Sequence, residues 1–295
     1  MLRKGAGLSA PEIDEGNRAL FSRFSGAALR AVAVVLMIAA PSLFLAGTAA
    51  DTAQIVMLVC IVSAIFTFTE YNSSSPSIVE FRDSPPFNRV RFLGLAGTVF
   101  ALTIIAKGAT NPTTATHVFE LIGGGLAEAV DFPYSPVRLI VLMLPEEAEI
   151  TFVNSVRTAA GLSYFVSLLT LTCFILILRL KNWPNQRGGF NVWTNLPMFD
   201  PTAGGDVVER LERDGQLNLI LGFLLPFLIP ALVKLTSDFI NPIQLQNPHT
   251  LIWTMTAWAF IPASLIMRGI AMLRVGQMIT AQRERAFQAN KEKED

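Results

Sequence analysis

Charged side chains are scarce in this sequence. Asp, Glu, Lys and Arg make up 16% of its 295 residues, whereas ordinary soluble domains carry about 25%. The deficit is concentrated in long uncharged runs, and the mean hydropathy is +0.47. Such runs are typical of membrane-spanning helices, so the sequence predicts an all-α, polytopic integral membrane protein. The formal net charge is zero, which argues against a broad basic surface for nucleic acid.

Residues that commonly carry chemistry are also few. The two cysteines, Cys60 and Cys173, both lie in apolar runs, and His117 and His249 are the only histidines. No Cys/His ligand spacing, phosphate-binding glycine loop or hydrolase motif occurs, so we expect no cofactor, metal or catalytic site. A histidine-based metal or haem site and a cation site on the carboxylates of EEAE, residues 146–149, are less favoured alternatives.

Six apolar segments approach the roughly 20 residues that a crossing helix needs. The predicted spans are residues 27–49, 52–69, 86–106, 159–178, 217–235 and 251–273. They form a transmembrane domain, 27–273, between an N-terminal segment, 1–26, and a C-terminal tail, 274–295. The connections include loops 70–85, 107–158 and 179–216. The run at 137–144 is too short to cross and is expected to be interfacial or re-entrant.

Lysine and arginine are distributed unevenly between the segments that flank these spans. One set of alternating segments holds 19 of the 23 Lys and Arg residues, and the other holds 4. Basic residues accumulate on the cytoplasmic side of membrane proteins. The sequence therefore predicts that both termini are cytoplasmic, and we expect the membrane to be the inner membrane of a bacterium.

The loop after the second span contains EFRDSPPFNRVRF, residues 80–92. We interpret it as a hinge on the lipid surface, with Phe87 at the headgroup boundary and Arg82, Arg89 and Arg91 reaching lipid phosphates. The preceding SSSP predicts the start of a short helix. A docking site for a cytoplasmic partner is the alternative, whereas three arginines are too few for a nucleic-acid patch.

The loop at 179–216 is rich in Pro, Gly and Asn and contains Trp183, Phe190 and Trp193. These aromatic residues favour the membrane interface, or they could contact a partner protein. Its end, residues 206–216, predicts a short amphipathic helix that leads into the fifth span. In the loop at 107–158, the run Gly123–Gly125 predicts a hinge or a close-packing point that interrupts a helix, and Pro145 predicts the start of another.

The predicted spans carry almost no charge, whereas intramembrane charges usually mark ion or proton pathways. Residues near the span ends, such as Glu70 and Arg268, are expected to reach water. Pro226 and Pro230 share one face of the fifth span and predict a kink, which is either static or a gating break. The sequence favours a non-enzymatic scaffold or accessory subunit with membrane-protein partners or a second copy. The alternative is a transporter, channel or lipid-handling protein.

Overall fold

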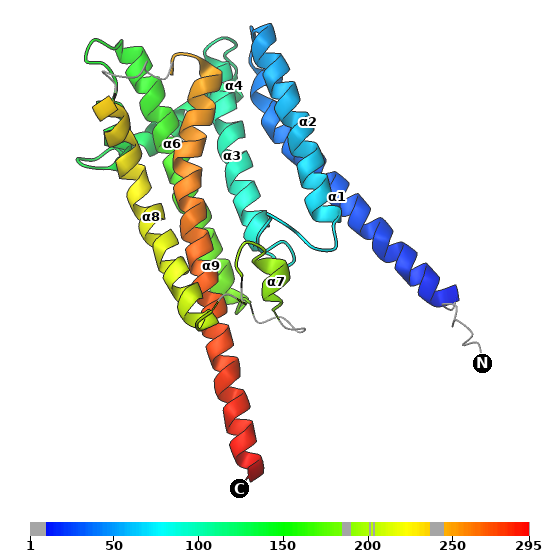
Figure 1. Cartoon of the computed structure of the whole chain (residues 1–295). Helices are drawn as coiled ribbons and strands as arrows, with labels where there is room; N and C mark the ends of the chain where they lie inside the picture. The colour runs from blue at the N-terminus through cyan, green and yellow to red at the C-terminus, as the bar shows by residue number, and fades with distance from the viewer. Residues whose placement is uncertain (1–9, 185–189, 201, 203, 237–244, 295) are drawn as a thin grey trace.

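The computed structural model describes residues 10–184, 190–200, 202, 204–236 and 245–294. Every regular element in these ranges is an α-helix, and they contain no strand. The helices are α1 (Ala10–Phe44), α2 (Ala50–Asn72), α3 (Phe87–Gly108), α4 (Thr114–Val130), α5 (Pro136–Leu142), α6 (Ile150–Leu180), α7 (Val192–Asn195), α8 (Val207–Thr236) and α9 (Pro248–Glu294) (Figure 1).

Six of these helices, α1, α2, α3, α6, α8 and α9, are long and apolar enough to cross a membrane. Each coincides with one of the six predicted spans, so the all-helical, six-span class of the chain is confirmed. The structure thus describes a multi-pass membrane protein. Figure 1 shows the start of α1 and the end of α9 projecting from the same end of the bundle, the end at which loop 73–86 and α7 lie. We call this the loop end.

The helices differ from the predicted segments mainly at their ends. α1 ends at Phe44 rather than at residue 49, and Gly47 turns the chain with a φ of 76°. The predicted surface helix at 206–216 is continuous with the fifth span in α8. No helix begins at Pro145, because residues 145–148 form a turn in which the Ala148 N–H donates to the Pro145 carbonyl, and α6 starts at Ile150.

The predicted loop at 107–158 contains two helices. α4 runs unbroken through Gly123–Gly125, which corrects the expectation of an interrupted helix. A Cβ on Gly123 would come within 2.9 Å of Ile105 Cδ1, so this glycine permits close packing of α4 on α3. Gly161 of α6 likewise lies directly against Ala127 of α4. Small residues at these contacts therefore allow α4 to pack closely against α3 and α6.

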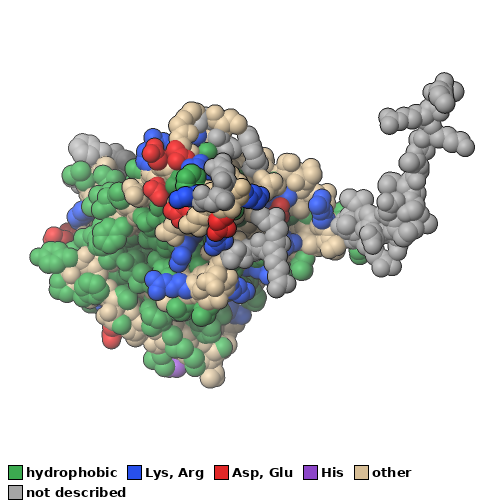
Figure 2. Space-filling view, turned by 90° about the horizontal axis from the view of Figure 1, so that it is seen from below, with side chains coloured by type: hydrophobic (Ala, Val, Ile, Leu, Met, Phe, Trp, Pro, Cys, Tyr) green, Lys and Arg blue, Asp and Glu red, His purple; other side chains and the backbone are tan. Residues whose placement is uncertain are grey.

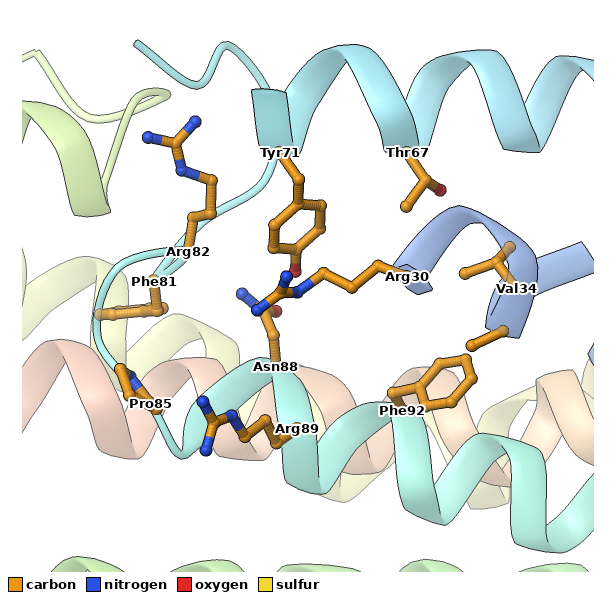
Figure 3. A pocket seen from close by; sticks show the side chains of 11 residues that line it. Arg30, Val34, Thr67, Tyr71, Phe81, Arg82, Pro85, Asn88, Arg89 and Phe92 are labelled. Carbon is orange, nitrogen blue, oxygen red and sulfur yellow. The ribbon is translucent and has the colours of Figure 1, made fainter. Parts of the chain in front are cut away.

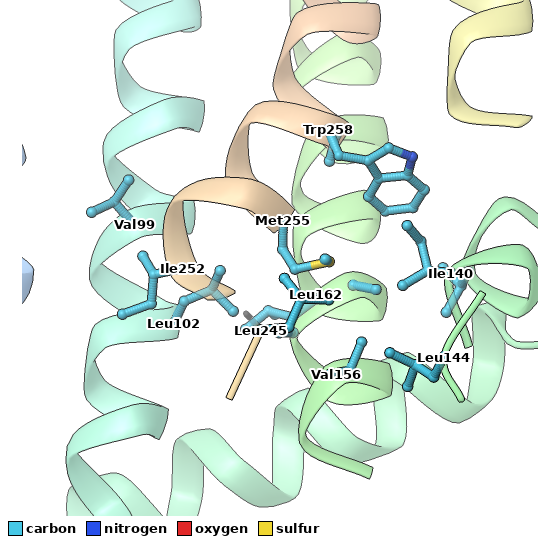
Figure 4. Packing of buried hydrophobic residues seen from close by; sticks show 14 of the residues in the cluster. Val99, Leu102, Ile140, Leu144, Val156, Leu162, Leu245, Ile252, Met255 and Trp258 are labelled. Carbon is cyan, nitrogen blue, oxygen red and sulfur yellow. The ribbon is translucent and has the colours of Figure 1, made fainter. Parts of the chain in front are cut away.

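α9 is the central helix and packs against α8, α6 and α3. The core between them includes Val99, Leu102, Val156 and Met255, all nearly inaccessible to solvent (Figure 4). α1 and α2 form a hairpin at the side of this core, and α2 packs chiefly against α1. Only 6% of the most apolar window of α2 is buried, so this helix presents its apolar surface outward.

Candidate functional site

Loop 73–86, between α2 and α3, is folded back onto the end of α2 by Glu70. The Glu70 carboxylate accepts the backbone N–H groups of Ser77, Ile78 and Val79 at 3.1–3.2 Å and also the Ser77 hydroxyl. The expected helix after SSSP does not form, and the segment consists of bends and turns instead. Glu70 is 6% exposed, so it is a structural acceptor of the loop rather than a group that reaches water.

Arg82 closes the same loop from the other side. Its Nη1 donates to the carbonyls of Glu70 and Ser73, both at 2.7 Å, which caps the end of α2. Its Nε and Nη2 form a bidentate pair with the Asp83 carboxylate, both at 3.0 Å. The Arg82 side chain is only 8% exposed. Most of its donors are therefore used within the protein, which corrects the expectation that Arg82 reaches lipid phosphates.

Five aromatic side chains join loop 73–86 to the segment after α6. Phe81 is fully buried, with ring centroids at 4.5 Å from Phe87 and 5.7 Å from Trp183. Phe174 and Phe190 complete this aromatic cluster. Phe87 and Trp183 are 1% and 4% exposed, so their side chains form contacts inside the protein. Aromatic pairs contribute roughly 0.5–1.5 kcal/mol each beyond their burial.

An ion pair connects loop 73–86 to the central helix. Glu80 Oε2 accepts Arg268 Nε at 2.6 Å, and Oε1 accepts Nη2 at 2.8 Å. The Glu80 and Arg268 side chains are 9% and 29% exposed. Arg268 is therefore an internal partner and is not turned toward water as expected. Nearby, the Arg91 guanidinium lies over the rings of Phe87 and Phe260, at 5.2 and 5.8 Å, and so is also directed into the protein.

Fewer of the predicted docking residues face outward than the sequence indicated. Arg89 is exposed and makes no hydrogen bond or ion pair with the residues that the structure describes. Phe190 is half-buried at the edge of the aromatic cluster. Trp193 belongs to α7, but its side chain lies outside the described residues.

A pocket of about 190 Å³ lies at the loop end between α1, α2 and α3. Arg30 extends from α1 into the space between Tyr71 of α2 and Asn88 of α3 (Figure 3). Its guanidinium lies 4.7 Å from the centroid of the Tyr71 ring, and Nη1 donates to the Gly26 carbonyl at 2.7 Å. The other lining residues are Ala33, Val34, Thr67, Phe81, Arg82, Pro85, Arg89 and Phe92.

The kink residues of α8 are packed against α9. Pro230 has no N–H to donate to the carbonyl of Pro226, four residues earlier. Trp258 of α9 donates its Nε1–H to that carbonyl at 3.2 Å. Both prolines are buried, and a Cβ on Gly222 would come within 2.7 Å of the Pro262 carbonyl. The freed carbonyl thus has a partner in a close helix pair, which favours a static kink over a gating break.

Sequence reasoning missed the ion pairs at the opposite end of the bundle. Asp131, which follows α4, pairs with Arg138 of α5 at 2.8 Å and with Arg157 of α6 at 3.0 Å. The Asp131 side chain is 6% exposed, so this carboxylate fixes three helices relative to one another. The only sequence signal was an acidic residue between two apolar helices. Its partners are distant in sequence, and pattern reasoning does not identify them.

The polar residues of the helices mostly bond within their own helix. The hydroxyls of Ser163, Thr170 and Thr172 donate to the carbonyls four residues earlier, and the Asn218 amide does the same. His249 contacts Thr48 at 3.1 Å, and His117 lies on α4 near Glu120. In the described part of the chain, no three His, Cys, Asp or Glu side chains are grouped to hold a metal ion.

Comparison of the chain with family models, curated proteins and solved structures found no match.

Proposed function

We propose that this chain is a non-enzymatic scaffold or accessory subunit of a membrane complex, and that its loop end faces the cytoplasm of a bacterium. The orientation is supported by the basic residues, because one set of alternating segments holds 19 of the 23 Lys and Arg residues, and the described parts of that set lie at the loop end. Figure 2 shows that charged side chains gather at this end, whereas the flanks are largely hydrophobic. The bundle would thus sit in the inner membrane with both termini inside.

The observation that carries the proposal is the length of α9. Its 47 residues span about 70 Å at 1.5 Å per residue, whereas the hydrocarbon core is about 30 Å thick. Figure 1 shows its C-terminal part projecting beyond the bundle. Every residue from Gln282 to Lys293 is exposed, and Phe287 is 73% exposed. We call residues 284–294 the α9 extension.

One ion pair holds the base of this extension. Arg283 Nη1 lies 2.9 and 3.0 Å from the two carboxylate oxygens of Asp206, directly before α8. The Val208 N–H and Arg283 lower the pKa of Asp206 below its usual value, so the pair is charged at neutral pH. Beyond Arg283, the side chains through Lys293 are all exposed, so the extension receives little packing energy from the described residues. Isolated helices of this length are marginal in water.

A partner that packs against the α9 extension would supply the missing stabilisation. Phe287 offers an apolar anchor among charged residues, which suits a helix-binding groove in a partner's cytoplasmic part. Of the residues predicted for docking, Arg89 and Phe190 remain at or near the surface, and both belong to the loop end. Phe87, Trp183 and Arg82 support this end from within. The partner is a second membrane protein or another copy of this chain.

The proposal can be tested with a photo-crosslinking amino acid at position 287 in growing cells. We expect crosslinking to one discrete protein, and loss of that protein from the native complex when residues 284–295 are deleted. The matched control is Leu228, a 45% exposed residue on the apolar surface of α8, where we expect no such product. A monomeric native protein whose position 287 yields no protein adduct would contradict the proposal.

A further inference from the structure

The pocket between α1, α2 and α3 has the composition of an anion site with one apolar wall. It is lined by Arg30, Arg82 and Arg89, and no Asp or Glu is among its lining residues. Tyr71 adds a hydroxyl as a donor, whereas the Asn88 amide nitrogen already donates to the Glu80 carbonyl at 2.7 Å. The opposite wall is apolar and includes Val34 and Phe92, half-buried residues that lie deeper along α1 and α3. In Figure 3, the Arg30 guanidinium is directed toward Tyr71 and Asn88, and Val34 and Phe92 lie on the other side of the pocket.

Two of the three arginines have no carboxylate partner among the described residues, so their positive charge is available to a ligand. Arg82 is neutralised by Asp83, whereas Arg30 bonds only to the uncharged Gly26 carbonyl and lies over the Tyr71 ring. Arg89 has no partner in the part of the chain that the structure describes. The nearest loop carboxylates are already engaged, since Glu70 accepts loop N–H groups and Glu80 pairs with Arg268. The pocket therefore has an excess of positive charge.

The position of the pocket indicates which kind of anion it binds. Its lining residues lie toward the loop end of three membrane-length helices, and the ends of crossing helices are where a bilayer presents its phosphate groups. Guanidinium groups bind phosphate oxygens through charge-assisted hydrogen bonds. The volume of about 190 Å³ is smaller than the roughly 300–1,000 Å³ of typical small-molecule pockets. It fits a headgroup phosphate whose acyl chains continue outside the pocket.

We propose that this pocket binds the phosphate of an anionic phospholipid from the surrounding leaflet, through Arg30 and Arg89. Such a lipid would connect the α1–α2 hairpin to α3, where the protein itself makes fewer contacts than within the hairpin. The charged wall holds the phosphate, and the apolar wall of Val34 and Phe92 receives the start of the acyl chains. This binding site is independent of the partner proposed for the α9 extension.

The test is native mass spectrometry of the purified full-length chain with added phosphatidylglycerol or phosphatidylcholine. We expect the wild type to retain phosphatidylglycerol preferentially. The double variant Arg30→Gln/Arg89→Gln should lose about tenfold in that preference, since two charge-assisted bonds are removed. The control Arg213→Gln/Arg285→Gln removes the same charge from exposed positions at the loop end and should remain within about twofold of wild type.

A second variant keeps the charge and removes the space. Ala33→Phe should fill the pocket and reduce phosphatidylglycerol retention while all arginines remain, and circular dichroism checks that the fold is intact. Unchanged retention in the arginine variant or in Ala33→Phe would overturn the proposal. Displacement of the lipid by millimolar glycerol phosphate from the wild type would also overturn it, because the ligand would then be a soluble phosphate compound.

Discussion

At the scale of single residues, the loop end is held by polar side chains that bind to distant backbone and side-chain groups. Glu70 accepts N–H groups of loop 73–86, and Arg82 donates to carbonyls at the end of α2 and to the Asp83 carboxylate. Glu80 reaches Arg268, which is 188 positions away in the chain. These contacts keep Phe81 inside the aromatic cluster although its φ is 52°, a value that non-glycine residues seldom adopt. Loop 73–86 is thus part of the core of the loop end.

The ion pair between Glu80 and Arg268 makes a prediction at this scale. Glu80→Gln should lower the free energy of unfolding by about 3 kcal/mol, because it leaves Arg268 half-buried beside a neutral amide. This value lies at the low end for buried pairs, since Arg268 retains 29% exposure. The midpoint of denaturant unfolding in detergent micelles measures the change.

The control for this variant is Glu120→Gln, which removes an exposed contact with His117 at 3.9 Å. We expect that change to stay below about 1 kcal/mol. Equal effects of the two variants would show that the Glu80–Arg268 pair contributes no more than a surface contact.

At the scale of elements, hydropathy identified the six membrane-length helices, because a crossing helix must be apolar over about 20 residues. It did not place their ends. α8 begins at Val207 because the surface helix and the fifth span have no break between them, and α4 continues through Gly123 because tertiary packing stabilises it. For a similar reason, the sequence did not indicate that the predicted docking residues Phe87 and Trp183 are buried. An aromatic residue in a loop has the same pattern whether it faces lipid, a partner or the interior.

The hydrogen bond from Trp258 of α9 to the Pro226 carbonyl of α8 gives a prediction about this pair of helices. Trp258→Phe removes the donor to the Pro226 carbonyl and should cost about 1 kcal/mol of unfolding free energy. In a Pro230→Ala background, the new N–H of residue 230 can donate to the same carbonyl. The cost of Trp258→Phe should therefore be smaller there, and a double-mutant cycle of unfolding free energies in micelles measures the difference.

Trp253→Phe provides the matched control in the same helix, because the Trp253 indole makes no hydrogen bond with the described residues. Its effect should add to that of Pro230→Ala. If Trp258→Phe is equally additive, the indole does not replace the helical bond that Pro230 removes, and the kink would have to be stabilised by packing alone.

At the scale of the whole molecule, the arrangement of the six helices brings the basic segments to one end. The sequence alone predicted this separation, because the alternation of Lys and Arg follows directly from the order of the spans. It could not predict the pocket, which requires Arg30, Tyr71 and Arg89 from three different helices to meet. Those contacts depend on how the α1–α2 hairpin packs against α3, and helix packing is not encoded in hydropathy.

The separation of charge predicts the threading of the chain. In a background in which Cys60 and Cys173 are replaced by alanine, single cysteines at positions 287 and 111 should report opposite sides of the membrane. A membrane-impermeant maleimide should label position 111 in intact spheroplasts, whereas position 287 should react only after lysis, because basic segments are retained in the cytoplasm. The reverse pattern would place the loop end outside. The α9 extension could then not meet a cytoplasmic partner, while the arginine-lined pocket would face the outer leaflet and could still bind an anionic lipid there.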